Sequence, residues 1–263
     1  MAEDCAATSL DGARRLGDKL LMADGLALRS DCLRRRDELA GARADMTAAI
    51  AIFRQIGDRW TLNLSLANLA VLELHEQDVP SARAHLEEAH RSAIEMNSPV
   101  ILQMILGNLG NAALVAGDVT AAKRYYREQM TDGRRTGDLM EVGYALLGLG
   151  LCASAERRHA LAAKLHGASD ALVSSLGQAL DPLEGGMQDR DLATLRTAMG
   201  AAFEPAYAVG SQIDFETAIA LAGSDGSETP RTFHPDPGDR ADRRSAPFPD
   251  ESKHVGAASQ TAN

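Results

Sequence analysis

The chain has few aromatic residues and few cysteines. Only 4% of its 263 residues are aromatic, and there is a single Trp. A core built mainly from aliphatic side chains suits closely packed helices better than strands. The three cysteines, Cys5, Cys32 and Cys152, lie far apart and show no CxxC spacing. This pattern argues against a disulfide framework or a zinc site and favours a reducing compartment.

The sequence also lacks an excess of positive charge and a long hydrophobic run. Its formal net charge is −10, so the clustered Lys and Arg that bind nucleic acids or anionic membranes are missing. The longest apolar run, residues 144–155, would span about 18 Å as a helix, well below the roughly 30 Å of a bilayer core. The N-terminus carries acids where a signal peptide carries positive charge. We therefore expect a cytoplasmic protein with no direct nucleic-acid partner and no membrane segment.

What the sequence does contain is an internal repeat. One recurring set supplies the left-handed residue that ends a helix, and it consists of Gly57, Asn97, Gly137 and Gly177. A second set permits close approach between packed helices, and it consists of Ala42, Ala82, Ala122 and Ala162. In both sets, successive members are 40 residues apart. A period between about 20 and 50 residues indicates a solenoid, in which each unit buries its apolar face only against its neighbours.

We interpret each unit as two antiparallel helices with amphipathic spacing. First helices are expected near residues 60–76, 99–116 and 139–156. Second helices are expected near residues 39–56, 79–96, 119–136 and 159–176, and an earlier helix near 12–35 would pair with the first of them. The predicted fold is therefore an all-α, right-handed superhelical solenoid of antiparallel helix pairs, with the repeats spanning residues 12–177.

Outside the repeats we expect three further segments. Residues 1–11 are predicted to be a flexible N-terminus. After Gly177 the period fails, a loop is expected around residues 181–186, and two capping helices near 189–199 and 214–222 would complete the segment 178–222. Residues 223–263 are rich in Pro, Ser, Gly and charges and are predicted to be a disordered tail.

One repeat carries a recognisable pattern in residues 108–126. It contains a Leu109-Gly110 pair, a Gly117-Asp118 turn, Ala122 and the aromatic Tyr126. This segment resembles a tetratricopeptide repeat, with a period of about 40 residues in place of the usual length of roughly 34 residues. The longer period is similar to that of the C-terminal helical arm of actinobacterial LuxR-type and related STAND signal-transduction ATPase regulators, and the similarity covers about residues 35–222.

This resemblance implies sensing or partner binding. In such regulators ATP hydrolysis and DNA binding belong to other domains, and this chain has neither a GxxxxGK[ST] phosphate loop nor a basic helix-turn-helix segment. The leading interpretation is a non-catalytic protein-interaction or sensor module, either stand-alone or a truncated arm of a transcriptional or signalling regulator. The alternatives are a transcription-regulatory protein that acts with a separate ATPase and DNA-binding partner, and a small-molecule sensor domain. The oligomeric state stays open.

Motifs that could carry chemistry have simpler explanations. The stretch 148–153 imitates a dinucleotide-binding loop, but it lies inside a predicted helix. His85 and His90 are five residues apart, His159 and His166 are seven apart, and no third ligand is close by, so we expect solvated or half-buried histidines. The sequence therefore predicts no catalytic residue, no cofactor and no metal, and a protein that is not an enzyme.

The candidate binding surface is the concave face lined by the first helices. Its lining is expected to be neutral and to bind an apolar or mixed peptide, because Asn side chains can pair with a peptide backbone. The alternative is that Asn68 and Asn108 only hydrogen-bond between neighbouring first helices. The predicted groove residues are Leu64, Asn68, Val71, Met104, Asn108, Asn111, Tyr144, Leu147 and Leu151.

Overall fold

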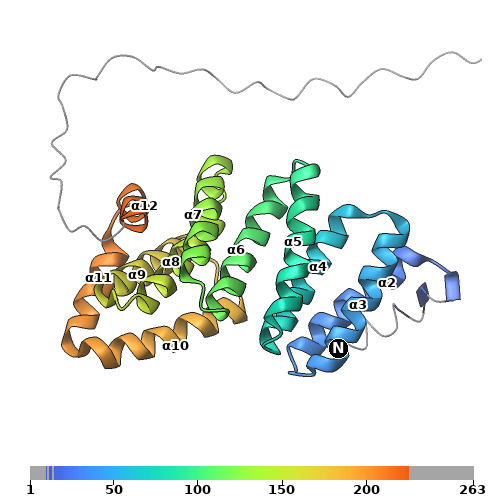
Figure 1. Ribbon diagram of the computed structural model, residues 1–263, viewed down its shortest axis with the longest axis horizontal. Helices are drawn as coiled ribbons and strands as arrows, with labels where there is room; N and C mark the ends of the chain where they lie inside the picture. Colours follow the sequence, from blue (N-terminus) through green and yellow to red (C-terminus); the bar gives the residue numbers. More distant parts are fainter. Residues whose placement is uncertain (1–9, 11, 14, 225–263) are drawn as a thin grey trace, which may run out of the picture. The chain divides into compact units, whose positions relative to one another are not determined.

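The computed structural model describes residue 10, residues 12–13 and residues 15–224, which belong to one compact unit. Within these residues every regular element is helical, so the predicted all-α solenoid is confirmed (Figure 1). The expected flexible N-terminus, residues 1–11, and the expected disordered tail, residues 223–263, lie outside the described residues, except for residues 10, 223 and 224. The helices are α2 (Lys19–Arg34), α3 (Leu39–Ile56), α4 (Arg59–His75), α5 (Val79–Glu95), α6 (Pro99–Val115), α7 (Val119–Thr136), α8 (Leu139–Ala155), α9 (His159–Ser175), α10 (Pro182–Met199), the short 3-10 helix η1 (Gly200–Ala202), α11 (Phe203–Gln212) and α12 (Phe215–Gly223).

The repeat register is confirmed, because α3 to α9 begin and end within one residue of their predicted bounds. The set that was expected to end the second helices has left-handed φ angles of 78° at Gly57, 49° at Asn97, 77° at Gly137 and 66° at Gly177. A second left-handed set, which the sequence did not reveal, lies in the turns after the first helices. Its members are Asp37, Gln77, Gly117 and Arg157, which again follow one another at intervals of one repeat.

Small residues permit the close packing of the helix pairs. All four members of the alanine set have no exposed surface, namely Ala42, Ala82, Ala122 and Ala162. The first helices also contact one another, α4 with α6 and α6 with α8, and so form one continuous layer. This layer is the inner face of the solenoid, as expected.

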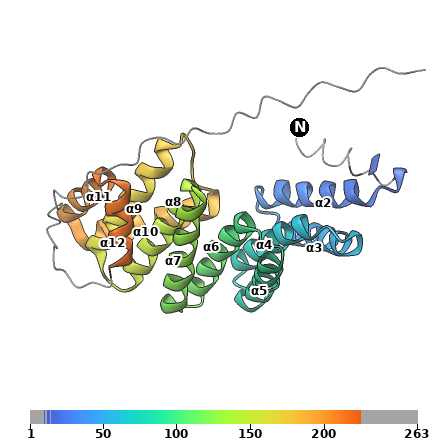
Figure 2. The ribbon, with the colours of Figure 1, turned by 90° about the horizontal axis from the view of Figure 1, so that it is seen from above.

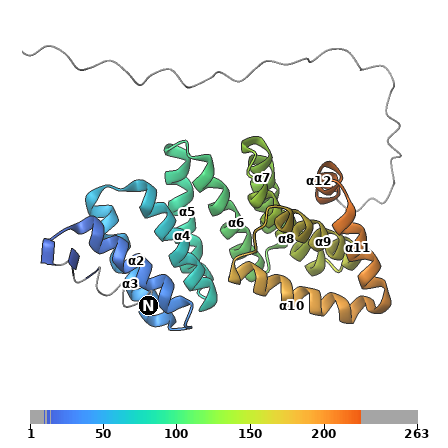
Figure 3. The same ribbon diagram turned by 180° about the vertical axis from the view of Figure 1, so that it is seen from behind.

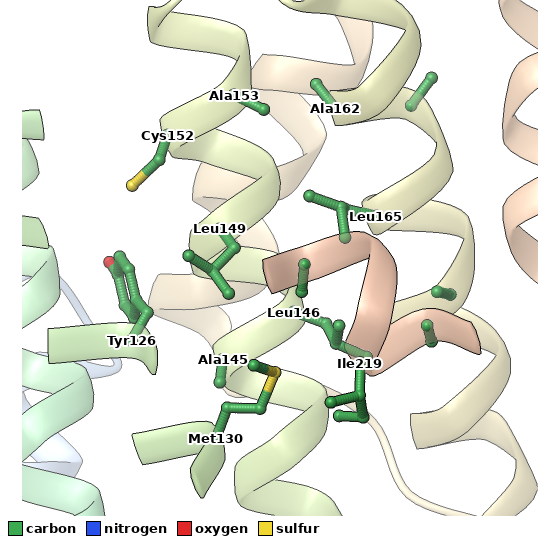
Figure 4. Packing of buried hydrophobic residues seen from close by; sticks show 14 of the residues in the cluster. Tyr126, Met130, Ala145, Leu146, Leu149, Cys152, Ala153, Ala162, Leu165 and Ile219 are labelled. Carbon is green, nitrogen blue, oxygen red and sulfur yellow. The ribbon is translucent and has the colours of Figure 1, made fainter. Parts of the chain in front are cut away.

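Tyr126 of α7 shows why glycine is present at positions 110 and 148. Its ring fills a slot between α6 and α8, where a Cβ atom on Gly110 or Gly148 would come within 2.5 Å or 2.4 Å of the ring carbons. Figure 4 shows the same ring beside Leu149 and Cys152 of α8, which belong with it to one cluster of buried apolar residues. The glycines are therefore required for the aromatic ring to pack.

The closing segment differs from the prediction. The expected loop at 181–186 is the first turn of α10, because Pro182 is tolerated at the start of a helix and Asp181 accepts the first backbone hydrogen bond from Gly185. A third helix, α11, was not predicted, and it packs against α9 (Figure 2). A Cβ atom on Gly210 of α11 would lie 2.0 Å from the carbonyl oxygen of Lys164, so only glycine allows this contact.

A buried polar cluster attaches α10 to α8 and α9. Ser154 Oγ donates a 2.6 Å hydrogen bond to Asp191 Oδ1, and His166 Nε2 lies 2.8 Å from Asp191 Oδ2. His166 is fully buried, so the expectation of a solvated or half-buried side chain is wrong for this residue. Figure 3 shows α10 running past α8 and α9.

The N-terminal helix is also shorter than expected. A positive φ of 67° at Gly17 interrupts the predicted helix 12–35, and Asp18 caps the new start of α2 by accepting a hydrogen bond from the Leu21 amide. In the part of the chain that the structure describes, no helix combines the length and the apolar character that crossing a membrane requires.

Candidate functional site

A cavity of about 380 Å³ opens on the inner face of the solenoid. Its walls come from the first helices α4, α6 and α8, from α3 and α7 behind them, and from the facing ends of α2 and α10. Leu64 and Leu151 are half-buried and do not line it, so the predicted groove was too long at both ends. The predicted residues that do line it are Asn68, Val71, Met104, Asn108, Asn111, Tyr144 and Leu147.

The lining is charged, which corrects the expectation of a neutral groove. The last turn of α2 contributes one acid and two arginines, and the start of α10 contributes two acids, while α8 adds Glu141. The solenoid thus brings charged residues from its two ends to the edges of the neutral stripe on the first helices. The charged lining residues are Asp31, Arg34, Arg35, Glu141, Asp181 and Glu184.

A chain of hydrogen bonds links the inner wall to α10. Tyr126 Oη donates a 2.7 Å bond to Asn111 Oδ1, and Asn111 Nδ2 donates a 3.0 Å bond to Glu184 Oε1. The amide of Asp181 donates a 3.2 Å bond to Tyr144 Oη. Asn111 thus orients one acid of the cavity, a role that its place in the predicted peptide groove did not indicate.

A second polar pair lies on the α7 and α8 side. Gln129 Nε2 donates a 2.7 Å hydrogen bond to Glu141 Oε2, and Gln129 is only 2% exposed. Its Oε1 atom is buried and has no hydrogen-bond partner among the described residues. Asn108 is 9% exposed and lines the cavity, and neither Asn108 nor Asn68 makes a side-chain hydrogen bond to a described residue. The alternative that these two asparagines only bridge neighbouring first helices is therefore wrong.

The acids on the α8 and α10 side lie in a negative, poorly hydrated environment. Burial raises the pKa of Glu141 above its usual value, and the charges of Asp138 and Glu184 add to this increase against the hydrogen bond from Gln129. Burial likewise raises the pKa of Glu184, and the charge of Asp181 acts in the same direction. The pKa of Tyr144 is raised to about 12, again first by burial and then by nearby acids.

The α2 side of the cavity carries one acid and two arginines, so it has an excess of one positive charge. Arg34 Nη2 lies 2.7 Å from Asp31 Oδ1, and Arg35 Nε lies 2.8 Å from Asp31 Oδ2. Although burial raises the pKa of Asp31, the hydrogen bonds from Arg35 and Arg34 lower it below its usual value overall. The two sides of the cavity therefore differ in sign: the α2 side has an excess of positive charge, whereas the acids of α8 and α10 form no ion pair with a described residue, although the charge of Arg34 acts on Glu184.

Some of these residues could have been found from the repeat register. Gln129 occupies a column in which the earlier copies have Ala49 and Ala89, so a polar side chain replaces a core alanine. Glu141 similarly shares a column with Thr61 and Ile101. No comparable signal marks the charged residues of α2 and α10, because only the superhelical path brings them beside the first helices.

A second hollow, of about 770 Å³, lies between α5, α6 and α7. Its walls are mostly apolar, with Arg83, Asp118 and Arg124 at the margin. Arg83 is held by Glu87 at 2.8 Å and Arg124 lies over the ring of Tyr125. None of the predicted groove residues lines this hollow, so the inner cavity is the candidate site. In the described residues no group of three or more His, Cys, Asp or Glu side chains is arranged to hold a metal ion.

Comparison with known proteins gives a likeness of fold. No protein-family model matches the chain, and no curated protein matches it either. The chain is similar to the crystal structure of BtubC (BKLC) from P. vanneervenii, with a TM-score of 0.62 and 19% sequence identity over 95% of this chain and 98% of that chain. At this identity the likeness shows that the two chains share a helical architecture, and it says nothing of a shared ligand.

Proposed function

We propose that this chain is a non-catalytic binding module whose inner cavity receives a peptide segment of a partner protein. The observation that carries the proposal is the cavity itself, which is walled by the predicted stripe of the first helices and contains a buried amide, Asn108, that makes no side-chain hydrogen bond to a described residue. Asn108 offers both a donor and an acceptor to an extended backbone. Val71, Met104 and Leu147 add apolar surface for side chains.

The setting proposed for this module is the cytoplasm. Cys32 and Cys152 are free in the structure, and burial raises the pKa of Cys152 to about 12, which keeps its thiol protonated and unreactive. A role within a transcriptional or signalling regulator follows only from the resemblance to LuxR-type and STAND arms, and it stays a prediction.

A small-molecule sensor is a second candidate function. The volume of about 380 Å³ falls in the range of roughly 300 to 1,000 Å³ that is usual for small-molecule sites. The ends of α2 and α10 also border the cavity on two sides, whereas an open peptide groove would lack such walls.

A selection from a random peptide library, with the full chain as bait, tests the peptide function. We expect enriched peptides to bind in solution with micromolar affinity, measured by fluorescence polarisation. Replacing Val71 by Trp fills the cavity and should weaken binding at least about tenfold. The matched control is Val100→Trp, because Val100 is 57% exposed and lies outside the lining.

Two results would contradict the peptide function. One is a library that yields no binder, and the other is a binder whose affinity is the same for Val71→Trp and Val100→Trp. A screen of metabolites by thermal melting tests the sensor function. If a compound raises the Tm of the parent chain but not that of Val71→Trp, the sensor function replaces the peptide function.

A further inference from the structure

The cavity has an uncompensated negative charge on one side. Its lining contains four acids and two arginines, and both arginines are already paired with Asp31 at 2.7 and 2.8 Å. Among the described residues no ion pair joins Arg34 or Arg35 to an acid of α8 or α10. The acids that form no ion pair with a described residue are Glu141, Asp181 and Glu184, although the charge of Arg34 acts on Glu184 from across the cavity.

Each of the two glutamates is oriented by a hydrogen bond from a neutral amide. Gln129 Nε2 donates to Oε2 of Glu141, and Asn111 Nδ2 donates to Oε1 of Glu184. Each neutral amide donates to one oxygen of its carboxylate, and Glu184 also accepts from its own backbone amide; because a carboxylate has about four acceptor positions, both glutamates can accept further hydrogen bonds. The glutamates are thus oriented by the protein without being neutralised by it.

The same wall holds an amide that makes no side-chain hydrogen bond and one buried acceptor without a partner. Asn108 lines the cavity, is 9% exposed and makes no side-chain hydrogen bond to a described residue. Gln129 also lines it, and its Oε1 atom is a buried acceptor with no partner among the described residues. An acceptor in the wall that has no partner gains a hydrogen bond from a donor in the cavity, so the wall favours an occupant that is rich in hydrogen-bond donors.

The opposite lining suits a hydrocarbon stem. Met46, Val71, Met104 and Leu147 supply apolar surface around the polar wall. Arg and Lys side chains combine such a stem with a charged head that has donors and no acceptor, and the planar guanidinium can pair with two carboxylates at once. A neutral or acidic occupant would leave the glutamates without a counter-charge.

We propose that the cavity binds the basic side chain, arginine or lysine, of the peptide that occupies the groove. Glu141 and Glu184 accept from the cationic head, Asn108 pairs with a remaining donor, and the stem lies along the apolar wall. This assignment rests on the proposed peptide function and names the residue type that the module selects.

Acetylated hexapeptide pools with one fixed position test this proposal on the full chain. The fixed residue is arginine, lysine, citrulline, norleucine or glutamate, and agmatine serves as the free cation. We expect calorimetric titration to give affinities for the arginine pool at least about tenfold higher than for the citrulline pool, since citrulline keeps the shape and loses the charge. The double variant Glu141→Gln and Glu184→Gln should abolish this preference while it keeps both amide hydrogen bonds.

The control and the remaining outcomes separate the two proposals. Glu88→Gln removes an exposed acid paired with Arg54 outside the cavity, and it should leave the arginine preference intact. If all pools bind equally and the glutamine variants change nothing, the basic-residue proposal is wrong and the peptide function stands. If agmatine binds and no pool does, the cation site stands and the peptide function is wrong. Absence of binding by every probe overturns both.

Discussion

The periodic repeats and the closing helices use different means to bury their surfaces. In residues 39–177 the same contacts recur in each repeat, with fully buried alanines between helices and left-handed residues at helix ends. In residues 178–224 the packing is particular to one place, as in the glycine contact between α9 and α11 and the partly buried Asp191 with its two partners. The comparison teaches that the repeats define the scaffold, whereas the closing helices add specific polar groups to it, including one side of the cavity.

The strongest way to break this comparison is to disturb the contact of α11 with α9. In Gly210→Ala the new Cβ atom would sit 2.0 Å from the Lys164 carbonyl oxygen, so α11 must move away from α9. Because backbone atoms cannot rotate out of the way, we expect a loss of about 3 kcal/mol or more in the free energy of unfolding. Urea denaturation followed by circular dichroism measures it.

Gly185→Ala is the matched control in α10. Its Cβ atom would meet only the Cβ of Leu180 at 3.8 Å, which is ordinary contact. Alanine has the higher helix propensity, so this variant should be more stable than the parent by about 0.5 to 1 kcal/mol. Equal effects of the two substitutions would show that α11 is not packed against α9 as the structure has it.

A second, smaller effect is expected inside the repeats. Ala82 and Ala84 lie on the same helix, α5, but Ala82 has no exposed surface and Ala84 is exposed. Overpacking by Ala82→Leu should cost about 2 kcal/mol in the free energy of unfolding, and Ala84→Leu should cost almost nothing. The pair is compared by the same denaturation method, and similar stabilities would refute the alanine register.

The sequence likewise predicts the helices of the periodic repeats better than the closing helices. The period located seven helices because Gly57 and Ala42 and their equivalents are repeated local signals. It missed α11, whose contact with α9 depends on two glycines that are distant in the sequence, Gly167 and Gly210, with no repeat to mark them.

The candidate site was likewise predicted on one side only. The stripe around Asn108 follows from helical geometry, because positions on one face of a first helix can be counted from the Leu-Gly pair. Arg34 and Glu184 reach the cavity through the superhelical path of the whole unit, which depends on the summed angles of successive helix pairs. Local sequence carries no direct measure of that sum.

The smallest effect expected concerns Glu184, where the closing helices meet the repeats. Burial, and to a smaller extent the charge of Asp181, raise its pKa in the folded state; the hydrogen bonds from its own backbone amide and from Asn111, together with the charge of Arg34, oppose this increase without cancelling it. A carboxyl group whose pKa is higher in the folded state than in the unfolded state binds its proton more tightly when the protein is folded. Its stabilising contribution is complete below the unfolded-state pKa, near 4.5, and is lost as the pH rises through the folded-state pKa. At pH 7.5 the ionised Glu184 therefore destabilises the fold.

Glu184→Gln keeps the acceptor for Asn111 and removes the charge, so its Tm should exceed that of the parent at pH 7.5. The difference should shrink as the pH falls towards 4.5, because the parent carboxyl then becomes neutral as well. Glu88→Gln, which loses only an exposed ion pair with Arg54, should show no such gain at pH 7.5. A parent that is more stable than Glu184→Gln at pH 7.5 would mean that a cation of the chain already neutralises this acid, and the contrast between the two sides of the cavity would disappear.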